Sequence, residues 1–79
     1  MMDKLKQMKP GESGEVTGYE QGSGAYRTRL LAMGLTKSTR FTVKSVAPMG
    51  DPVEIEIRGS RLTLRKGEAD ALIVRRINA

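Results

Sequence analysis

The amino-acid sequence predicts a mainly β protein with short helices, folded as a small five-stranded barrel. Apolar and polar residues alternate over short stretches, glycines recur between these stretches, and the chain has only 79 residues. Five short strands in so short a chain cannot form a two-sheet sandwich of ordinary size. A small, partly open barrel accommodates them, and both the SH3-like and the OB-type barrel fit this description. The length allows one domain, residues 1–79.

The first predicted strand covers residues 15–20, in which Gly18 marks a bend or a bulge. A helix of about residues 25–33 follows, between the first and second strands. Ser23 precedes this helix and is suited to its N-cap.

The predicted helix has one apolar face and a defined end. Tyr26, Leu30 and Met33 recur at helical spacing, so we expect them to face the core. Gly34 stands where a left-handed residue ends many helices, and Leu35 is then expected to fold back onto Leu30. Leu31, in contrast, lies well around the helix from Tyr26 and is poorly placed for the core.

The second predicted strand covers residues 40–47 and changes phase along its length. Phe41 and Val43 are apolar at odd positions, whereas the next apolar residue, Val46, is at an even one. A bulge or sharp bend between Val43 and Val46 would place all three side chains on one face.

Residues 53–65 predict a hairpin, with alternating apolar residues on both strands and Gly59-Ser60 as a two-residue turn. With this turn, Ile57 belongs to the first cross-strand pair on the core face of the hairpin. This turn predicts four cross-strand pairs: Ile57–Leu62, Ile55–Leu64, Glu54–Arg65 and Glu56–Thr63. A helical turn at 68–71 and a last strand at 72–77 complete the predicted elements.

The composition argues against catalysis. The chain contains neither histidine nor cysteine, the usual residues of nucleophilic and acid–base catalysis. The stretch "GSGAYR" lacks the third glycine of a dinucleotide-binding motif, and no phosphate-binding loop is present. We therefore expect no enzyme activity, no cofactor and no small-molecule substrate.

A metal site would have to use carboxylates alone. The candidates are Asp51, Glu54, Glu56, Glu68 and Asp70. Glu54 and Glu56 share a strand face, but the predicted register places Arg65 opposite Glu54. We therefore expect a salt-bridged outer face rather than a metal site.

The formal net charge of +5 is compatible with nucleic acid, an anionic membrane surface or an acidic partner, and equally with an ordinary solvated surface of mixed charge. Binding of single-stranded nucleic acid by a small barrel usually needs exposed aromatic side chains for base stacking. The only aromatic residues are Tyr19, Tyr26 and Phe41, and the last two look like core residues. Nucleic-acid binding is therefore the less favoured alternative.

A protein-binding module remains, with candidate contacts on the helix and in the stretch "APMGDP" (47–52). Two prolines stiffen this loop, its glycine is suited to positive φ, and Met49 lies at its tip. An apolar side chain without a core role is a candidate contact. The predicted partner-binding residues are Leu31, Met49, Arg27, Pro48 and Asp51.

Three motifs resemble the FeoA family of small SH3-like proteins. The first is R-x-x-L-x-x-M-G-L (27–35), the second A-P-M-G-D-P-V (47–53) and the third L-T-L-R-K (62–66). They occur in the family's order over residues 25–69. One departure is Lys37-Ser38, where relatives often have a Pro-Gly pair, so a non-glycine residue has to make that turn.

The resemblance implies an SH3-like barrel and an accessory role in bacterial ferrous iron uptake, together with FeoB, a membrane permease with a cytoplasmic GTP-binding region. It also leaves open a regulator-type SH3-like domain for another protein partner, because similar domains occur in metal-dependent repressors. The N-terminus lacks the apolar core of a signal peptide, and no apolar run is long enough to cross a bilayer. We therefore expect a cytoplasmic protein.

Overall fold

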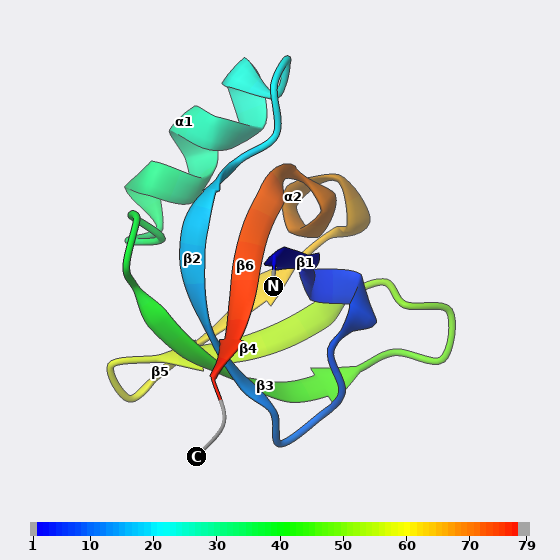
Figure 1. The fold of residues 1–79 in the computed structure, drawn as a ribbon. Helices are drawn as coiled ribbons and strands as arrows, with labels where there is room; N and C mark the ends of the chain where they lie inside the picture. Colours follow the sequence, from blue (N-terminus) through cyan, green and yellow to red (C-terminus); the bar gives the residue numbers. More distant parts are fainter. Residues whose placement is uncertain (1, 78–79) are drawn as a thin grey trace.

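Six antiparallel strands form one strongly curved sheet in the computed structural model, which describes residues 2–77 (Figure 1). Their order across the sheet is β1-β6-β2-β3-β4-β5. The strands are β1 (Met2–Lys4), β2 (Ser13–Tyr19), β3 (Arg40–Val46), β4 (Val53–Ile57), β5 (Ser60–Leu64) and β6 (Leu72–Ile77). The helices are a 3-10 turn (Leu5–Gln7), α1 (Gly24–Ala32) and α2 (Lys66–Ala71).

The five predicted strands are confirmed as β2 to β6, and the predicted helix between the first two of them is confirmed as α1. The sixth strand, β1, was not expected. It pairs with β6 from Met2↔Arg75 to Lys4↔Ile73. The 3-10 turn after it brings Leu5 and Met8 into the core, where both are almost fully buried. No local sequence pattern indicates that β1 is a strand, because the residues of β6 with which it pairs lie about 70 positions away in the chain.

The barrel interior holds a single cluster of buried hydrophobic side chains, to which every strand from β2 to β6 contributes. Leu30 and Leu35 bring the region of α1 into this cluster, and neither is exposed. Phe41 is buried, as predicted. Tyr26 is not, because 40% of its surface remains exposed. The prediction for Tyr26 was wrong because its ring lies against Gly67 of α2, whereas Leu30 is the residue of α1 that is buried in the core.

The predicted helix ending is confirmed. Gly34 has φ +92°, its N–H donates to the carbonyl of Leu31, and the N–H of Leu35 donates to that of Leu30 at 3.0 Å. This bond pattern is a Schellman motif. At the other end, Ser23 is the N-cap residue, but its hydroxyl donates to the carbonyl of Glu20 and does not cap the helix.

Both predicted irregularities are present. The register of β2 against β6 shifts between Val16 and Gly18, and that of β3 against β4 shifts between Val43 and Ser45. Each bulge strengthens the local bend, which allows one sheet to curve around its own core.

The predicted hairpin register was wrong, because the two-residue turn lies one position earlier in the chain than predicted. The turn residues are Arg58 and Gly59, with φ +48° and +81°, so Ile57 pairs with Ser60 and Ile55 with Leu62. Positive φ at both positions is typical of a type I′ turn, whose twist matches that of the strands. In this register Thr63 lies opposite Glu54, and Glu54 makes a diagonal ion pair with Arg61, at 2.9 Å, instead of facing Arg65.

The turn between α1 and β3 is made by a non-glycine residue, as predicted, and the structure shows that this residue has positive φ. Ser38 has φ +72°, and its N–H donates to the carbonyl of Val16 at 2.7 Å. The N–H of Val16 in turn donates to the carbonyl of Thr39. The strained residue thus lies within a ladder that fastens the turn to β2.

Replacing Ser38 with glycine is expected to raise the free energy of unfolding by about 0.5–1 kcal/mol, because glycine has no Cβ to penalise positive φ. Urea unfolding followed by circular dichroism measures this change. Ser60→Gly is the matched control: Ser60 is an exposed strand residue without positive φ, and glycine there should lower the free energy of unfolding. A loss of stability in Ser38→Gly would contradict the explanation.

Candidate functional site

Helix α1 is attached to the barrel by few of its side chains. Among its nine residues only Leu30 is buried. Leu31 is 40% exposed, as predicted from its position around the helix. Figure 1 shows α1 beyond the upper end of β2, outside the curve of the sheet. A helix that leaves most of its surface uncovered is a candidate docking element.

One side of α1 rests on α2. The hydroxyl oxygen of Tyr26 lies only 2.5 Å from where a Cβ would stand at Gly67, so the absence of a side chain there makes room for the ring. Arg29 reaches the buried carboxylate of Glu68 at 3.2 Å, and that carboxylate also accepts the N–H of Arg65 at 2.9 Å. The buried Glu68 carboxylate therefore links α1 to α2 through Arg29, and these bonds compensate for its burial.

The opposite side of α1 borders a groove of about 410 Å³, here called the helix groove. Its lining includes Tyr19, Glu20, Arg27, Lys37 and Ile73. The guanidinium carbon of Arg27 lies 5.4 Å from the centre of the Tyr19 ring, a cation–π distance. The Tyr19 hydroxyl donates to the carbonyl of Leu35 at 2.6 Å. Burial raises the pKa of the Tyr19 phenol above its ordinary value, while Arg27 acts in the opposite direction.

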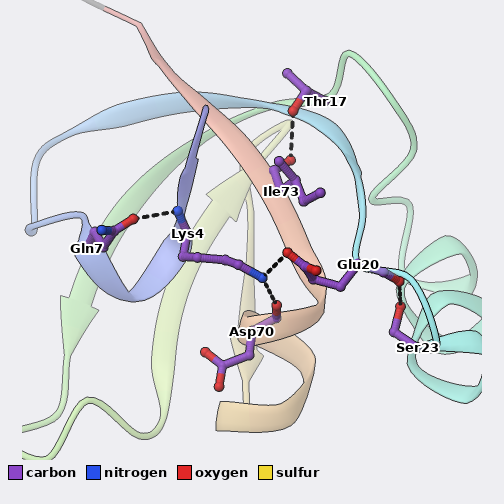
Figure 2. Close-up of polar contacts among 7 residues, drawn as sticks. All are labelled: Lys4, Gln7, Thr17, Glu20, Ser23, Asp70 and Ile73. Atoms are coloured by element: carbon purple, nitrogen blue, oxygen red, sulfur yellow. Dashed lines mark hydrogen bonds and ion pairs between the residues drawn. The ribbon is translucent and has the colours of Figure 1, made fainter. Parts of the chain in front are cut away.

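The N-terminal segment contacts Glu20, one of the residues that line the helix groove. Figure 2 shows the ammonium group of Lys4 between the Glu20 carboxylate, with which it forms an ion pair, and the carbonyl of Asp70, at 2.8 Å. Next to it, the hydroxyl of Thr17 donates to the carbonyl of Ile73 at 3.1 Å. Lys4 therefore joins β1, the end of β2 and α2 at one point.

The loop between β3 and β4 carries the other predicted contacts. Met49 is 91% exposed, and Gly50 before the second proline has φ +79°, as expected for this stiff turn. Pro48 is exposed as well. Asp51, however, accepts the N–H of Lys66 at 3.0 Å and so fastens the loop to the first turn of α2. Asp51 thus has a structural role that its sequence position did not reveal.

The five predicted contact residues form two groups rather than one surface. Arg27 and Leu31 lie four residues apart on α1, and Pro48, Met49 and Asp51 share the β3–β4 loop. In Figure 1 this loop lies at the right of the molecule and α1 at the upper left. A small surface of a partner protein could therefore contact one of these groups but not both at once.

A second groove of about 400 Å³, here called the hairpin groove, lies at the other end of β2. Its lining includes Ser13, Arg40, Glu56, Arg58 and Ile77. Its carboxylate, Glu56, faces Lys44 at 3.5 Å. Neither groove was predicted from the sequence, because each is lined by segments far apart along the chain. Within residues 2–77, no three acidic side chains come together as a metal site would require.

The FeoA domain model matches residues 4–76 of this chain. A fusion protein of Fe(2+) transport protein A and Fe(2+) transporter FeoB from Porphyromonas gingivalis is 30% identical over 76 residues, which cover 96% of this chain and 9% of the fusion protein. The chain thus spans about a tenth of the length of that relative. Among residues 2–77 there is no helix with the length and apolar character to cross a membrane.

Solved structures agree with this match. The crystal structure of an iron uptake regulatory protein, FeoA, has a TM-score of 0.85 and 34% identity and covers 98% of this chain and all of that chain. A manganese-dependent transcriptional repressor has a TM-score of 0.88 at 17% identity, over 96% of this chain and 37% of the repressor chain. At that identity the likeness concerns the fold alone. The expected SH3-like fold is confirmed.

Proposed function

This chain belongs to the FeoA family, and on that premise we propose that it is a cytoplasmic accessory protein of bacterial ferrous iron uptake that docks onto a FeoB-type permease. The observation that carries the proposal is the relative in which a FeoA part and the transporter FeoB form one polypeptide. Fusion keeps two partners at an effective concentration in the millimolar range, which favours pairs that work in contact.

Docking would regulate the permease by binding one of its conformations more tightly than another. A bound protein shifts an equilibrium only by the difference between its affinities for the two states. The cytoplasmic GTP-binding region of the permease is the expected docking partner. Among the side chains that the structure describes, the exposed large apolar ones lie on helix α1 and on the stiff β3–β4 loop, which could offer them to this partner.

Leu31→Gln and Met49→Asp test the two elements separately. If α1 docks, Leu31→Gln should weaken binding to the purified permease about fivefold or more, because an apolar side chain that is now partly exposed would no longer be buried in the complex. Met49→Asp should have the same effect if the loop docks. Binding is measured by biolayer interferometry, and ferrous iron uptake is measured in cells that lack the protein and are complemented with each variant.

Lys9→Gln is the control, since Lys9 is exposed and belongs to neither element. If both folded variants bind the permease and restore uptake as the unchanged protein does, the assigned contact residues are wrong. If the unchanged protein itself neither binds the permease nor supports uptake, the proposed function is wrong.

A further inference from the structure

The positive charge of this protein is concentrated in one part of the chain. Residues 21–50 contain five Lys or Arg residues and no Asp or Glu, and the remaining residues contain nine of each, so the net charge of +5 comes from this segment. Arg29 and Lys44 are paired with Glu68 and Glu56. The other three, Arg27, Lys37 and Arg40, make no ion pair among the side chains that the structure describes.

These three cations lie at the two grooves, where Arg58 joins them. Arg27 and Lys37 line the helix groove, and Arg40 and Arg58 line the hairpin groove. Arg58 also lies near the end of α1, because its Nη1 is 3.8 Å from the position of a Cβ at Gly34. Like the other three, Arg58 makes no ion pair within residues 2–77. We call Arg27, Lys37, Arg40 and Arg58 the cationic face.

The two grooves open along the outer face of the same strand pair. Ile73 lines the helix groove and Ile77 the hairpin groove, while the intervening Val74 points into the core. Ile73 and Ile77 are both half-buried and point outward. Four residues of strand separate them by about 13 Å. The ion pair between Glu15 and Arg75, at 2.6 Å, occupies the space between the grooves.

We propose that the cationic face binds an acidic, extended polypeptide segment of a partner, with one carboxylate cluster in each groove. Two unpaired cations in each groove provide charge complementarity to such clusters. The half-exposed Ile73 and Ile77 provide apolar contact beside them. The partner's identity as the permease rests on the proposed function, whereas recognition of the acidic segment does not.

Several features favour a polypeptide over nucleic acid. Binding of a nucleic acid strand usually combines a continuous cationic track with exposed aromatic rings. Here the track is interrupted by the carboxylate of Glu15, and each groove contains a further carboxylate, Glu20 or Glu56. The only aromatic ring at the helix groove, Tyr19, is covered by Arg27 and bonded through its hydroxyl. Discrete pairs of cations match discrete carboxylates better than they match a regular series of phosphates.

The test uses the full chain and a fluorescein-labelled peptide of about ten residues, with two glutamate pairs about four residues apart to match the strand spacing. Fluorescence anisotropy at low salt measures its binding. The double variant Lys37→Glu, Arg40→Glu should weaken binding about tenfold or more, because attraction is replaced by repulsion in both grooves. The control Lys6→Glu, Lys9→Glu changes charge equally at exposed positions outside both grooves and should leave binding within about twofold.

Three results would overturn the proposal. The first is an equal loss of binding in both double variants, and the second is no peptide binding by the unchanged chain. The third is tighter binding to a DNA duplex or to phosphatidylserine vesicles than to the peptide. A chain that binds the peptide but not the purified permease would refute the proposed function and leave this inference standing.

Discussion

Replacing Leu30 with alanine is expected to lower the free energy of unfolding by about 2–5 kcal/mol, the usual cost of removing a fully buried leucine side chain. Leu30 is the only residue of α1 that is buried, and no part of it is exposed. A chain of this size is typically stable by about 4–12 kcal/mol, so the variant would lose a large share of its stability. Urea unfolding of both proteins, analysed with a common slope, measures the difference.

Leu31→Ala is the matched control, because it removes the same atoms one position along the same helix. Leu31 is 40% exposed, so its loss should change the free energy of unfolding by no more than about 1 kcal/mol. The two variants thus distinguish Leu30, which anchors α1 in the core, from Leu31, which α1 exposes to solvent. Equal destabilisation by both would show that α1 is packed differently.

Gly14→Ala is expected to cost about 1–3 kcal/mol of unfolding free energy through overpacking. A Cβ at Gly14 would lie 2.8 Å from Cζ of Phe41 and 3.1 Å from the carbonyl oxygen of Arg75. Phe41 is buried and the carbonyl belongs to the β6 backbone, so neither can move without disturbing the sheet. Thermal unfolding followed by circular dichroism should show a clearly lower midpoint.

Gly18→Ala, in the same strand, serves as its control. Nothing lies within 4 Å of a Cβ at Gly18, and its φ is not positive. The alanine should therefore leave the protein as stable as before or about 0.4–1 kcal/mol more stable, because it restricts the unfolded chain. If Gly14→Ala were tolerated as well as Gly18→Ala, the close approach of Phe41 to Gly14 would be wrong.

The hairpin was predicted correctly as an element, but its cross-strand register was not. Moving the turn from Gly59-Ser60 to Arg58-Gly59 changes which residues face each other but keeps the same side chains on the core face. Alternation therefore cannot distinguish the two registers. The ion pair of Glu54 was assigned to Arg65 rather than to Arg61 for the same reason.

The candidate site was predicted only in part. The exposure of Leu31 and Met49 followed from a helical angle and from a loop stiffened by prolines, both local features. The grooves and the cationic face did not follow, because Arg58 belongs to the β4–β5 turn and joins Arg27, Lys37 and Arg40 at the grooves only in the folded chain. The net charge of +5 alone also does not show that all the excess positive charge lies in residues 21–50.

The sequence by itself determined the strands β2 to β6, both bulges and the ending of α1. These features depend on residues close together in the chain, such as Leu30, Gly34 and Leu35, whose bonds close within six residues. Only the tertiary structure decided the place of β1, the exposure of Tyr26 and the convergence of cations on two grooves. Each of these depends on contacts between residues far apart in the chain, and local alternation carries no information about such contacts.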